Sequence, residues 1–357
     1  MRDLILRFPH VAEQIFQQLD NKSLAKCREI ERLWQKFIDE RNYTWLRIVN
    51  IPTILHYRNT YMHLAAQYGQ TDMFEIILEE EENKNPKNDA GETPFLVACC
   101  KGRMNIVSLI LKKYDELKID LSTKNKGDQT AFHLACSNGH SEMAEMMITK
   151  WSELKIDLGI NNNNGWTVFH TACYAGHLKV AELIMKNSSN LKIDLNNKHN
   201  NDNTAFNFAC WNGHSDIAEL ILKNSSKLKI NLNITNRNSR TAFHGACYIG
   251  HSEIAEMIMK NSSELKIDLN TTDNCGLTPF HLACRNGHIR IIDMMIEWSE
   301  SLELDLKAED RDDKTGYQLA KYHGRIDIVN LIQTKMPCLA VEKGSPASTV
   351  FSSCRIS

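Results

Sequence analysis

Apolar and polar positions repeat along most of the chain in blocks that each predict a pair of helices. In one block, Thr130 to His140 reads TAFHLACSNGH, and the apolar residues Met143, Met146 and Met147 follow it. Apolar residues three and four positions apart lie on one face of a helix. The block therefore predicts one helix before its glycine and a second helix after it.

The block recurs at a nearly fixed interval. Its opening threonine stands at eight positions, 33 residues apart at the first step and 37 at the later six: Thr60, Thr93, Thr130, Thr167, Thr204, Thr241, Thr278 and Thr315. A glycine follows nine residues after each of them: Gly69, Gly102, Gly139, Gly176, Gly213, Gly250, Gly287 and Gly324. A period of this length predicts stacked repeats, all-α in class.

Each repeat carries its own start and stop signals. We expect the first helix to start at the threonine, which proline follows in Pro94 and Pro279, and to end at the glycine. After the second helix comes an alternating segment such as LKIDL, Leu265 to Leu269, which leads to a turn. A turn-forming residue stands two positions before each later threonine: Gly91, Asp128, Gly165, Asp202, Ser239, Gly276 and Asp313.

Residues 1–48 lack the repeat and predict a small three-helix unit. Val11, Ile15 and Leu19 have helical spacing, and Ser23 suits the N-cap of a second helix. About 40 residues are too few to bury a stable core alone. We therefore expect the apolar faces to pack on the repeats or on a partner protein.

The repeats are expected to fill residues 60–336, between two different flanking segments. Residues 49–59 contain Pro52 and are not a flexible Gly/Ser linker, so they predict a stiff joint. Residues 337–357 are rich in serine and lack periodicity, which predicts a disordered tail.

Composition limits the classes of partner and the cellular compartments that we expect for this chain. The 357 residues carry a formal charge of −2, which gives no electrostatic case for nucleic acid or an anionic membrane as the main partner. The N-terminus shows no signal peptide, and no apolar run is long enough to span a membrane. We expect a protein of the cytoplasm or the nucleus.

Most of the eleven cysteines occupy one repeat position, namely Cys99, Cys136, Cys173, Cys210, Cys247 and Cys284. Stacked helices lie roughly 8–10 Å apart, whereas a disulfide needs Cα atoms within about 7 Å. No C-x-x-C pattern suggests zinc. We interpret these residues as small buried thiols in a reducing compartment.

The repeat is similar to the ankyrin repeat, whose hallmark is T-P-L-H-x-A-A followed by G-H; TPFHLACRNGH from Thr278 carries it here. The resemblance implies an α-solenoid of about eight helix pairs with β-turn fingers. The usual period is about 33 residues. The four extra residues of the later repeats, in KNSSELKI from Lys260 and its copies, equal about one helical turn. We therefore expect a longer second helix.

The first 48 residues resemble the F-box, through Phe8-Pro9, Ile15, Leu19-Asp20, Ser23-Leu24, Cys27-Arg28, Trp34 and Trp45-Leu46. This resemblance implies docking on the Skp-type adaptor of a cullin ubiquitin ligase. It places at or beneath that contact the residues Pro9, Ile15, Leu19, Leu24, Cys27 and Trp34. The alternative interpretation is that they form the core of a helical cap on the solenoid.

Two sets of histidines could suggest chemistry. His133, His170, His244 and His281 each precede a cysteine by three residues, a spacing that would suit a metal pair on one helix face. The ankyrin resemblance implies instead that this histidine hydrogen-bonds the turn before the helix. The histidines after the glycine, such as His140, fit the loop between helices. No nucleophile elbow, P-loop, dinucleotide fingerprint or HExxH occurs, so we expect no catalytic residue, metal or cofactor.

Binding residues are expected where the repeats differ from one another. In ankyrins the turn tips and the end of the first helix face a concave groove. Aromatic residues and arginine dominate interface energies. The groove candidates are Trp166, Tyr174, Trp211, Arg237, Arg240, Tyr248, Ile249, Leu277, Arg285 and Tyr322. The alternative is that these side chains only pack on neighbouring turns.

The two resemblances together imply a non-catalytic substrate receptor of an Skp–cullin–F-box ubiquitin ligase, with the target in the ankyrin groove. A scaffold with no ubiquitin role is the alternative. A third possibility comes from the C-terminus, where Cys354-Arg-Ile-Ser loosely fits the C-a-a-X pattern and would tether a prenylated chain to a membrane. Arg355 does not suit the aliphatic position, so we interpret the tail as unmodified.

Overall fold

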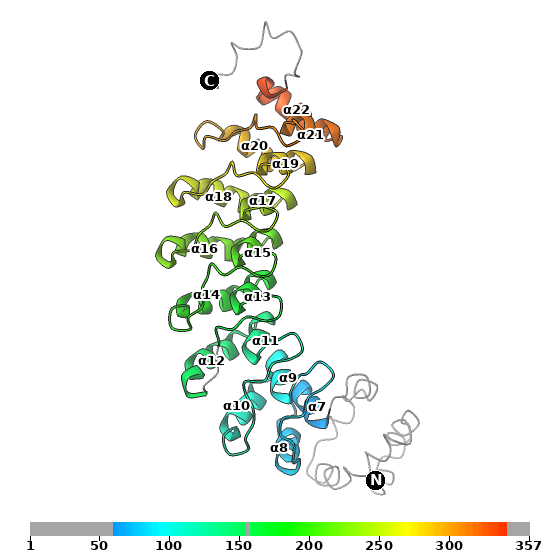
Figure 1. Ribbon diagram of the computed structural model, residues 1–357, viewed down its shortest axis with the longest axis vertical. Coiled ribbons are helices and arrows are strands. Elements are labelled where there is room, and N and C mark those ends of the chain that lie inside the picture. The colour runs from blue at the N-terminus through cyan, green and yellow to red at the C-terminus, as the bar shows by residue number, and fades with distance from the viewer. Residues whose placement is uncertain (1–59, 155–157, 341–357) are drawn as a thin grey trace, which may run out of the picture. The chain divides into compact units, whose positions relative to one another are not determined.

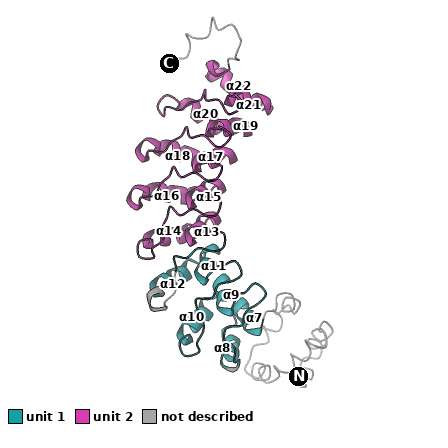
Figure 2. Cartoon of the chain, in the orientation of Figure 1, with its two compact units in different colours: residues 1–163 teal, residues 164–357 magenta. Residues whose placement is uncertain are grey.

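A computed structural model describes residues 60–154 and 158–340. The predicted three-helix unit, the joint and Cys354 lie outside these residues. The chain divides into two compact units, residues 1–163 and 164–357 (Figure 2). Each is described by itself as unit 1 and unit 2.

Unit 1 holds three described helix pairs. Their bounds are α7 Tyr61–Tyr68 with α8 Thr71–Glu80, α9 Pro94–Cys100 with α10 Met104–Lys113, and α11 Ala131–Ser137 with α12 Ser141–Leu154. The first helices α7, α9 and α11 pack in chain order, and α8 packs on α10 (Figure 1).

Unit 2 holds five described pairs and a short 3₁₀ helix. The pairs are α13 Val168–Ala175 with α14 Leu178–Asn187, α15 Ala205–Asn212 with α16 Ser215–Leu228, α17 Ala242–Ile249 with α18 Ser252–Leu265, α19 Pro279–Asn286 with α20 Ile289–Glu297, and α21 Gly316–Tyr322 with α22 Ile326–Lys335; η1 is Pro337–Leu339. First helices again pack on first helices and second on second (Figure 1). The described part of the chain is helical and contains no strand.

The predicted start and stop signals are confirmed. Each of the eight first helices has its threonine as N-cap; Thr241, for example, accepts a hydrogen bond from the N–H of His244. All eight glycines after these helices have positive φ, and so do the seven predicted turn residues. Left-handed backbone ends a helix and reverses the chain in the turn.

The extra residues of the longer repeats extend the second helix in three of the described repeats. Helices α12, α16 and α18 have 14 residues, against 10 in α8 of the short first repeat. In α10, α14 and α20 the added residues follow the helix as turns instead. The extension stops at one recurring residue with positive φ, which the sequence pattern did not predict: Lys118, Lys192, Lys229, Lys266 and Glu303.

At several of these positions with positive φ, an asparagine side chain of the preceding repeat hydrogen-bonds the backbone. Asn233 donates from Nδ2 to the carbonyl of Lys266 at 2.8 Å and accepts from the N–H of Asp268 at 2.9 Å. Asn196 makes the same pair of bonds with Lys229 and Asn231. The elongated repeats are thereby coupled along their outer edge.

The core lies between the two layers of helices in each unit. Phe132, Phe169 and Phe243 are almost completely buried, and so are the six cysteines of the repeat position. The described cysteines are free thiols, and burial raises the pKa of Cys136 and its copies. These thiols are inert core atoms, since the thiolate is the reactive form.

The predicted boundary of the tail is corrected at its first residues. Residues 337–339 form η1 beside α22, and Leu339 is buried. Its apolar side chain packs at the end of the last repeat, and the rest of the predicted tail lies outside the described residues. None of the described helices is long and apolar enough to cross a bilayer.

Candidate protein-binding surface

The first set of histidines belongs to the frame of the repeats, by which we mean the capping and turn residues that recur from repeat to repeat. Nδ1 of His244 accepts from the backbone N–H of Thr241 at 3.2 Å and lies 2.9 Å from its hydroxyl. Nε2 therefore carries the proton, and it donates to the carbonyl of Leu277 in the next repeat at 3.2 Å. His170 and His281 repeat this arrangement. Both ring nitrogens are used, so neither is available to a metal.

Burial also keeps these histidines neutral. Loss of solvent around the ring lowers the pKa of His170 and of His244 to about 4, although each ring donates to a backbone carbonyl. Asn207 replaces the histidine in α15 and caps Thr204 in the same way, with Oδ1 accepting its N–H at 3.0 Å. No group of three or more His, Cys, Asp or Glu residues within the described ranges could hold a metal ion.

The second set of histidines positions the variable side chains. Nε2 of His214, His251 and His288 lies 2.9–3.1 Å from the backbone carbonyls of Tyr174, Trp211 and Tyr248, respectively. In the last repeat Arg325 takes this place and donates from Nε to the carbonyl of Arg285 at 3.0 Å. The backbones of Tyr174, Trp211, Tyr248 and Arg285 are thus held by the next repeat, and Tyr322 occupies the same position in the last repeat. We name this set the helix-end row: Tyr174, Trp211, Tyr248, Arg285 and Tyr322.

Trp211 and Tyr248 form a stacked pair in the helix-end row. Their rings are stacked, with centroids 5.3 Å apart and planes 18° from parallel. The Arg240 guanidinium lies over the Tyr248 ring at 5.3 Å, and the buried Asp273 holds it through an ion pair of 3.0 Å. Trp211 remains 38% exposed. We call Trp211, Tyr248 and Arg240 the stacked platform.

Trp166 and Tyr174 differ from the platform. Trp166 is half-buried, and its ring centroid lies 4.7 Å from Phe208 and 5.0 Å from Tyr174. Tyr174 meets Trp166 edge-on and is 50% exposed. The Trp166 side chain is thus used mainly in packing on its neighbours, whereas the exposed Tyr174 side chain is accessible to a partner.

Leu277 is expected from the sequence to line the groove, but the structure places it in the core. It is buried with Leu282 and Leu319, and Tyr248 packs against this cluster. The position before each helix threonine carries Arg240 in one repeat and Leu277 in the next. Leu277 points inward because its apolar chain gains by burial, so it supports Tyr248 from below and offers no groove surface.

The remaining candidates are exposed. Ile249 is 39% exposed, and the side chain of Arg237 is 65% exposed, 3.8 Å from the Asp202 carboxylate. Arg285 is exposed at the end of α19. Tyr322 is 74% exposed, with Nζ of Lys314 4.7 Å from its ring centre.

Sequence reasoning missed several residues that build this surface. Gly245 lies under the Trp211 ring, Asp273 fixes Arg240, and Lys314 lies over Tyr322. Two of them gave a signal. Gly245 stands where other repeats hold Leu134, Thr171, Phe208 or Leu282, and Lys314 precedes its helix threonine at the repeat position of the candidates Trp166 and Arg240. A glycine in a column of larger residues indicates a close approach by another group.

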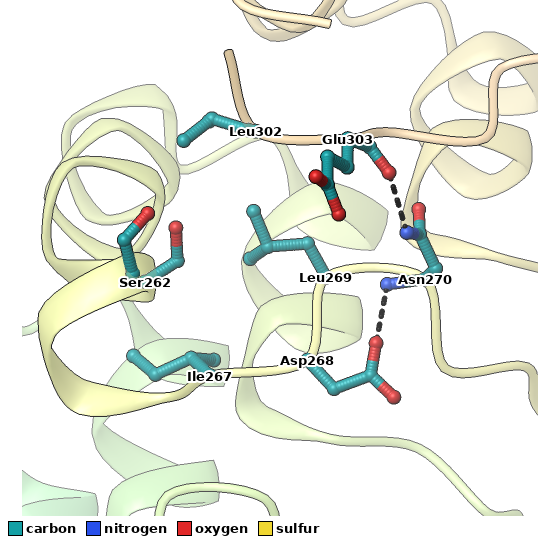
Figure 3. Close-up of a pocket in the computed structure, with 8 residues that line it drawn as sticks. Ser262, Ile267, Asp268, Leu269, Asn270, Leu302 and Glu303 are labelled. Carbon is teal, nitrogen blue, oxygen red and sulfur yellow. Dashed lines mark hydrogen bonds between the residues drawn. The ribbon is translucent and has the colours of Figure 1, made fainter. Parts of the chain in front are cut away.

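A separate depression of about 220 Å³ lies beside the C-terminal end of α18 (Figure 3). Its lining includes Leu269, Leu302 and Glu303, and Asn270 crosses it with a hydrogen bond to the Glu303 carbonyl. This is one of the asparagine couplings between repeats. The depression therefore belongs to the frame rather than to the helix-end row.

Comparisons with known proteins agree with this geometry. A family model described as ankyrin repeats in three copies matches five overlapping windows: residues 62–157, 113–198, 150–236, 190–273 and 226–307. Together they cover residues 62–307, more than half of the chain. A comparison with curated proteins gives no significant match.

Proposed function

The chain belongs to the ankyrin-repeat family, and on that premise we propose that it is the substrate receptor of an Skp–cullin–F-box ubiquitin ligase. Ankyrin repeats are protein-binding modules and in general are not catalysts. In the proposed complex, the repeats hold the target and residues 1–48 hold the adaptor. The mechanism is proximity, because a tethered target meets the conjugating enzyme at a high effective concentration.

The stacked platform is the observation that carries the binding role. Trp211 is 38% exposed at a position where another repeat has Ser137, so the fold does not need an indole there. Its ring is already ordered by Tyr248, and a preordered aromatic ring loses little entropy when a partner covers it. We propose the helix-end row, with Ile249 and Arg237 beside it, as the target-binding surface.

The adaptor-binding role is supported by the F-box-like pattern of residues 1–48. The proposed contacts are Pro9, Ile15, Leu19, Leu24, Cys27 and Trp34. Such a complex acts in the cytoplasm or the nucleus. The competing proposal is an ankyrin scaffold whose N-terminal helices cap the repeats and which has no adaptor.

Copurification of the full chain with the Skp-type adaptor tests the first role. We expect Leu19→Ala combined with Trp34→Ala to abolish adaptor recovery, while Trp211→Ala leaves it unchanged. An adaptor that stays bound to the folded double variant would refute the docking residues. No adaptor complex with the unaltered chain would favour the scaffold.

The target is identified by affinity purification with the proteasome and neddylation blocked, followed by mass spectrometry. Proteins lost with Trp211→Ala but kept with Leu19→Ala plus Trp34→Ala are the expected targets. Equal membrane partitioning of the unaltered chain and Cys354→Ser would remove the tethered alternative.

A further inference from the structure

Chemical character changes along the helix-end row of unit 2. Its middle is the stacked platform, whose Arg240 is neutralised by the buried Asp273. The next position along the row is Arg285, after which Tyr322 carries Lys314 over its ring. An apolar stretch is therefore followed by a basic one.

The basic stretch consists of Arg285, Lys314 and Arg325. Arg325 Nε bonds the Arg285 carbonyl at 3.0 Å, and His323 lies beside Tyr322 with ring centroids 5.1 Å apart. Within the described residues, none of the three cations makes an ion pair. Their charge is available to a ligand.

The surroundings of His323 indicate that the three cations act on one place. His323 is exposed, and slight desolvation followed by the charges of Arg285, Arg325 and Lys314 lowers its pKa. Asp310, an acid of the same repeat, is engaged elsewhere: its Oδ1 accepts from the N–H groups of Asp312 and Lys314 at 2.9 Å in the turn. Asp312 and Asp313 belong to that turn too, so they offset part of the positive potential at its tip.

We propose that unit 2 binds an extended acidic segment of a partner protein. The segment places an aromatic or large apolar side chain on the stacked platform and its carboxylates at Arg285, Lys314 and Arg325. The proposal rests on the proposed function, because it names the class of target that the helix-end row accepts.

The distance between neighbouring residues of the helix-end row sets the spacing expected between the aromatic and the acidic residues of the ligand. Neighbouring helices lie roughly 8–10 Å apart, and an extended chain advances about 3.3 Å per residue. The step from the platform to Arg285 therefore spans about three residues of ligand, and Lys314 lies about one repeat further. The acids should follow or precede the aromatic residue by roughly three to six positions.

Selection of random 16-residue peptides on the full chain tests this chemistry. We expect enriched peptides to combine one aromatic residue with Asp or Glu at that spacing. The best peptide, labelled with fluorescein, then reports affinity by anisotropy. Trp211→Ala should weaken its binding about tenfold or more, and Arg285→Glu plus Lys314→Glu should do likewise.

A matched control has the same change in charge elsewhere. Lys223→Glu plus Arg290→Glu reverses two exposed cations on α16 and α20, away from the row, and should leave affinity within about twofold. Neutral or basic peptides that still require Trp211 would overturn the acidic partner and leave the proposed function standing. Peptides indifferent to both Trp211 and Arg285, or no enriched peptide at all, would overturn both.

Discussion

The indole of Trp211 lies against the backbone of Gly245. A Cβ built on Gly245 would be 3.3 Å from Cε3 of Trp211, which is tighter than most contacts of a real Cβ, and 3.8 Å from the Trp211 Cβ, an ordinary contact. The missing side chain lets the ring lie across α17 and stack on Tyr248. In the preceding repeat Phe208 fills the same position, and Tyr174 there packs edge-on instead of flat.

Replacement of Gly245 should therefore displace Trp211 without breaking the helix. Leucine occupies this position in α11 and α19, and it is a better helix former than glycine by about 1 kcal/mol. The new side chain would occupy the space of the indole, and such overpacking costs about 1–3 kcal/mol. We expect Gly245→Leu to weaken the near-ultraviolet circular dichroism of the stacked rings and to reduce target binding.

A double-mutant cycle isolates the contact. In a Trp211→Ala background, Gly245→Leu meets no indole, so the urea midpoint should stay the same or rise. An equal loss in both backgrounds would mean that Gly245 serves another purpose.

The sequence predicts the frame better than the surface for a physical reason. Thr241, His244 and Gly250 act through local bonds and local backbone geometry, which recur wherever the letters recur. The side chain before the threonine depends on its neighbours: Arg240 is drawn to Asp273, whereas Leu277 turns into the core. The residue types found at this one repeat position do not reveal that difference.

The end of the long second helix shows the same limit. LKID reads as an alternating segment, yet Lys266 has φ 54° and stops the helix. The conformation is supported by Asn233 from the preceding repeat, 33 residues away. The end of this helix is therefore fixed by a contact between repeats and not by the local sequence pattern.

The glycine after each first helix makes a separate prediction. Gly213 has φ 79°, and an added Cβ would be 2.5 Å from Cε1 of His251, the histidine that holds the Trp211 carbonyl. Gly213→Ala should lower the free energy of unfolding by about 2–4 kcal/mol in urea titrations, through backbone strain and displacement of the histidine.

Gly324 is the matched control for that substitution. It has φ 67°, and nothing lies within 4 Å of its built Cβ. Gly324→Ala should therefore cost only the backbone strain, about 1–2 kcal/mol. Equal losses at Gly213 and Gly324 would show that the histidine contact contributes nothing.

The asparagine couplings predict a loss at the outer edge. Asn233→Ala leaves the carbonyl of Lys266 and the N–H of Asp268 without their partner, and we expect a loss of about 1–2 kcal/mol in the free energy of unfolding. The exposed Asn238 provides the comparison, since Asn238→Ala should change stability by less than about 0.5 kcal/mol. Amide exchange at Asp268 should accelerate only in the first variant; unchanged protection there would refute the coupling.

The buried histidines predict a dependence of stability on pH. His170 and His244 have pKa values of about 4 in the folded chain, below their ordinary value of 6.5, because burial disfavours the charged ring. Unfolded chains therefore take up protons first as the pH falls. The stabilisation is complete above pH 6.5 and is lost between pH 6.5 and about 4, by on the order of 3 kcal/mol for each histidine.

Carboxylates also titrate near the lower end of that window, so the control must keep the fold and remove only the two rings. Asn207 already caps a first helix in this chain, with Oδ1 accepting the Thr204 N–H at 3.0 Å. His170→Asn combined with His244→Asn should keep both caps, lose the hydrogen bonds to the next repeat and lower stability at pH 7. Its urea midpoint should then fall less steeply than that of the unaltered chain from pH 6.5 to 4.5. If the two slopes coincide, the buried histidines do not set the acid sensitivity of unit 2.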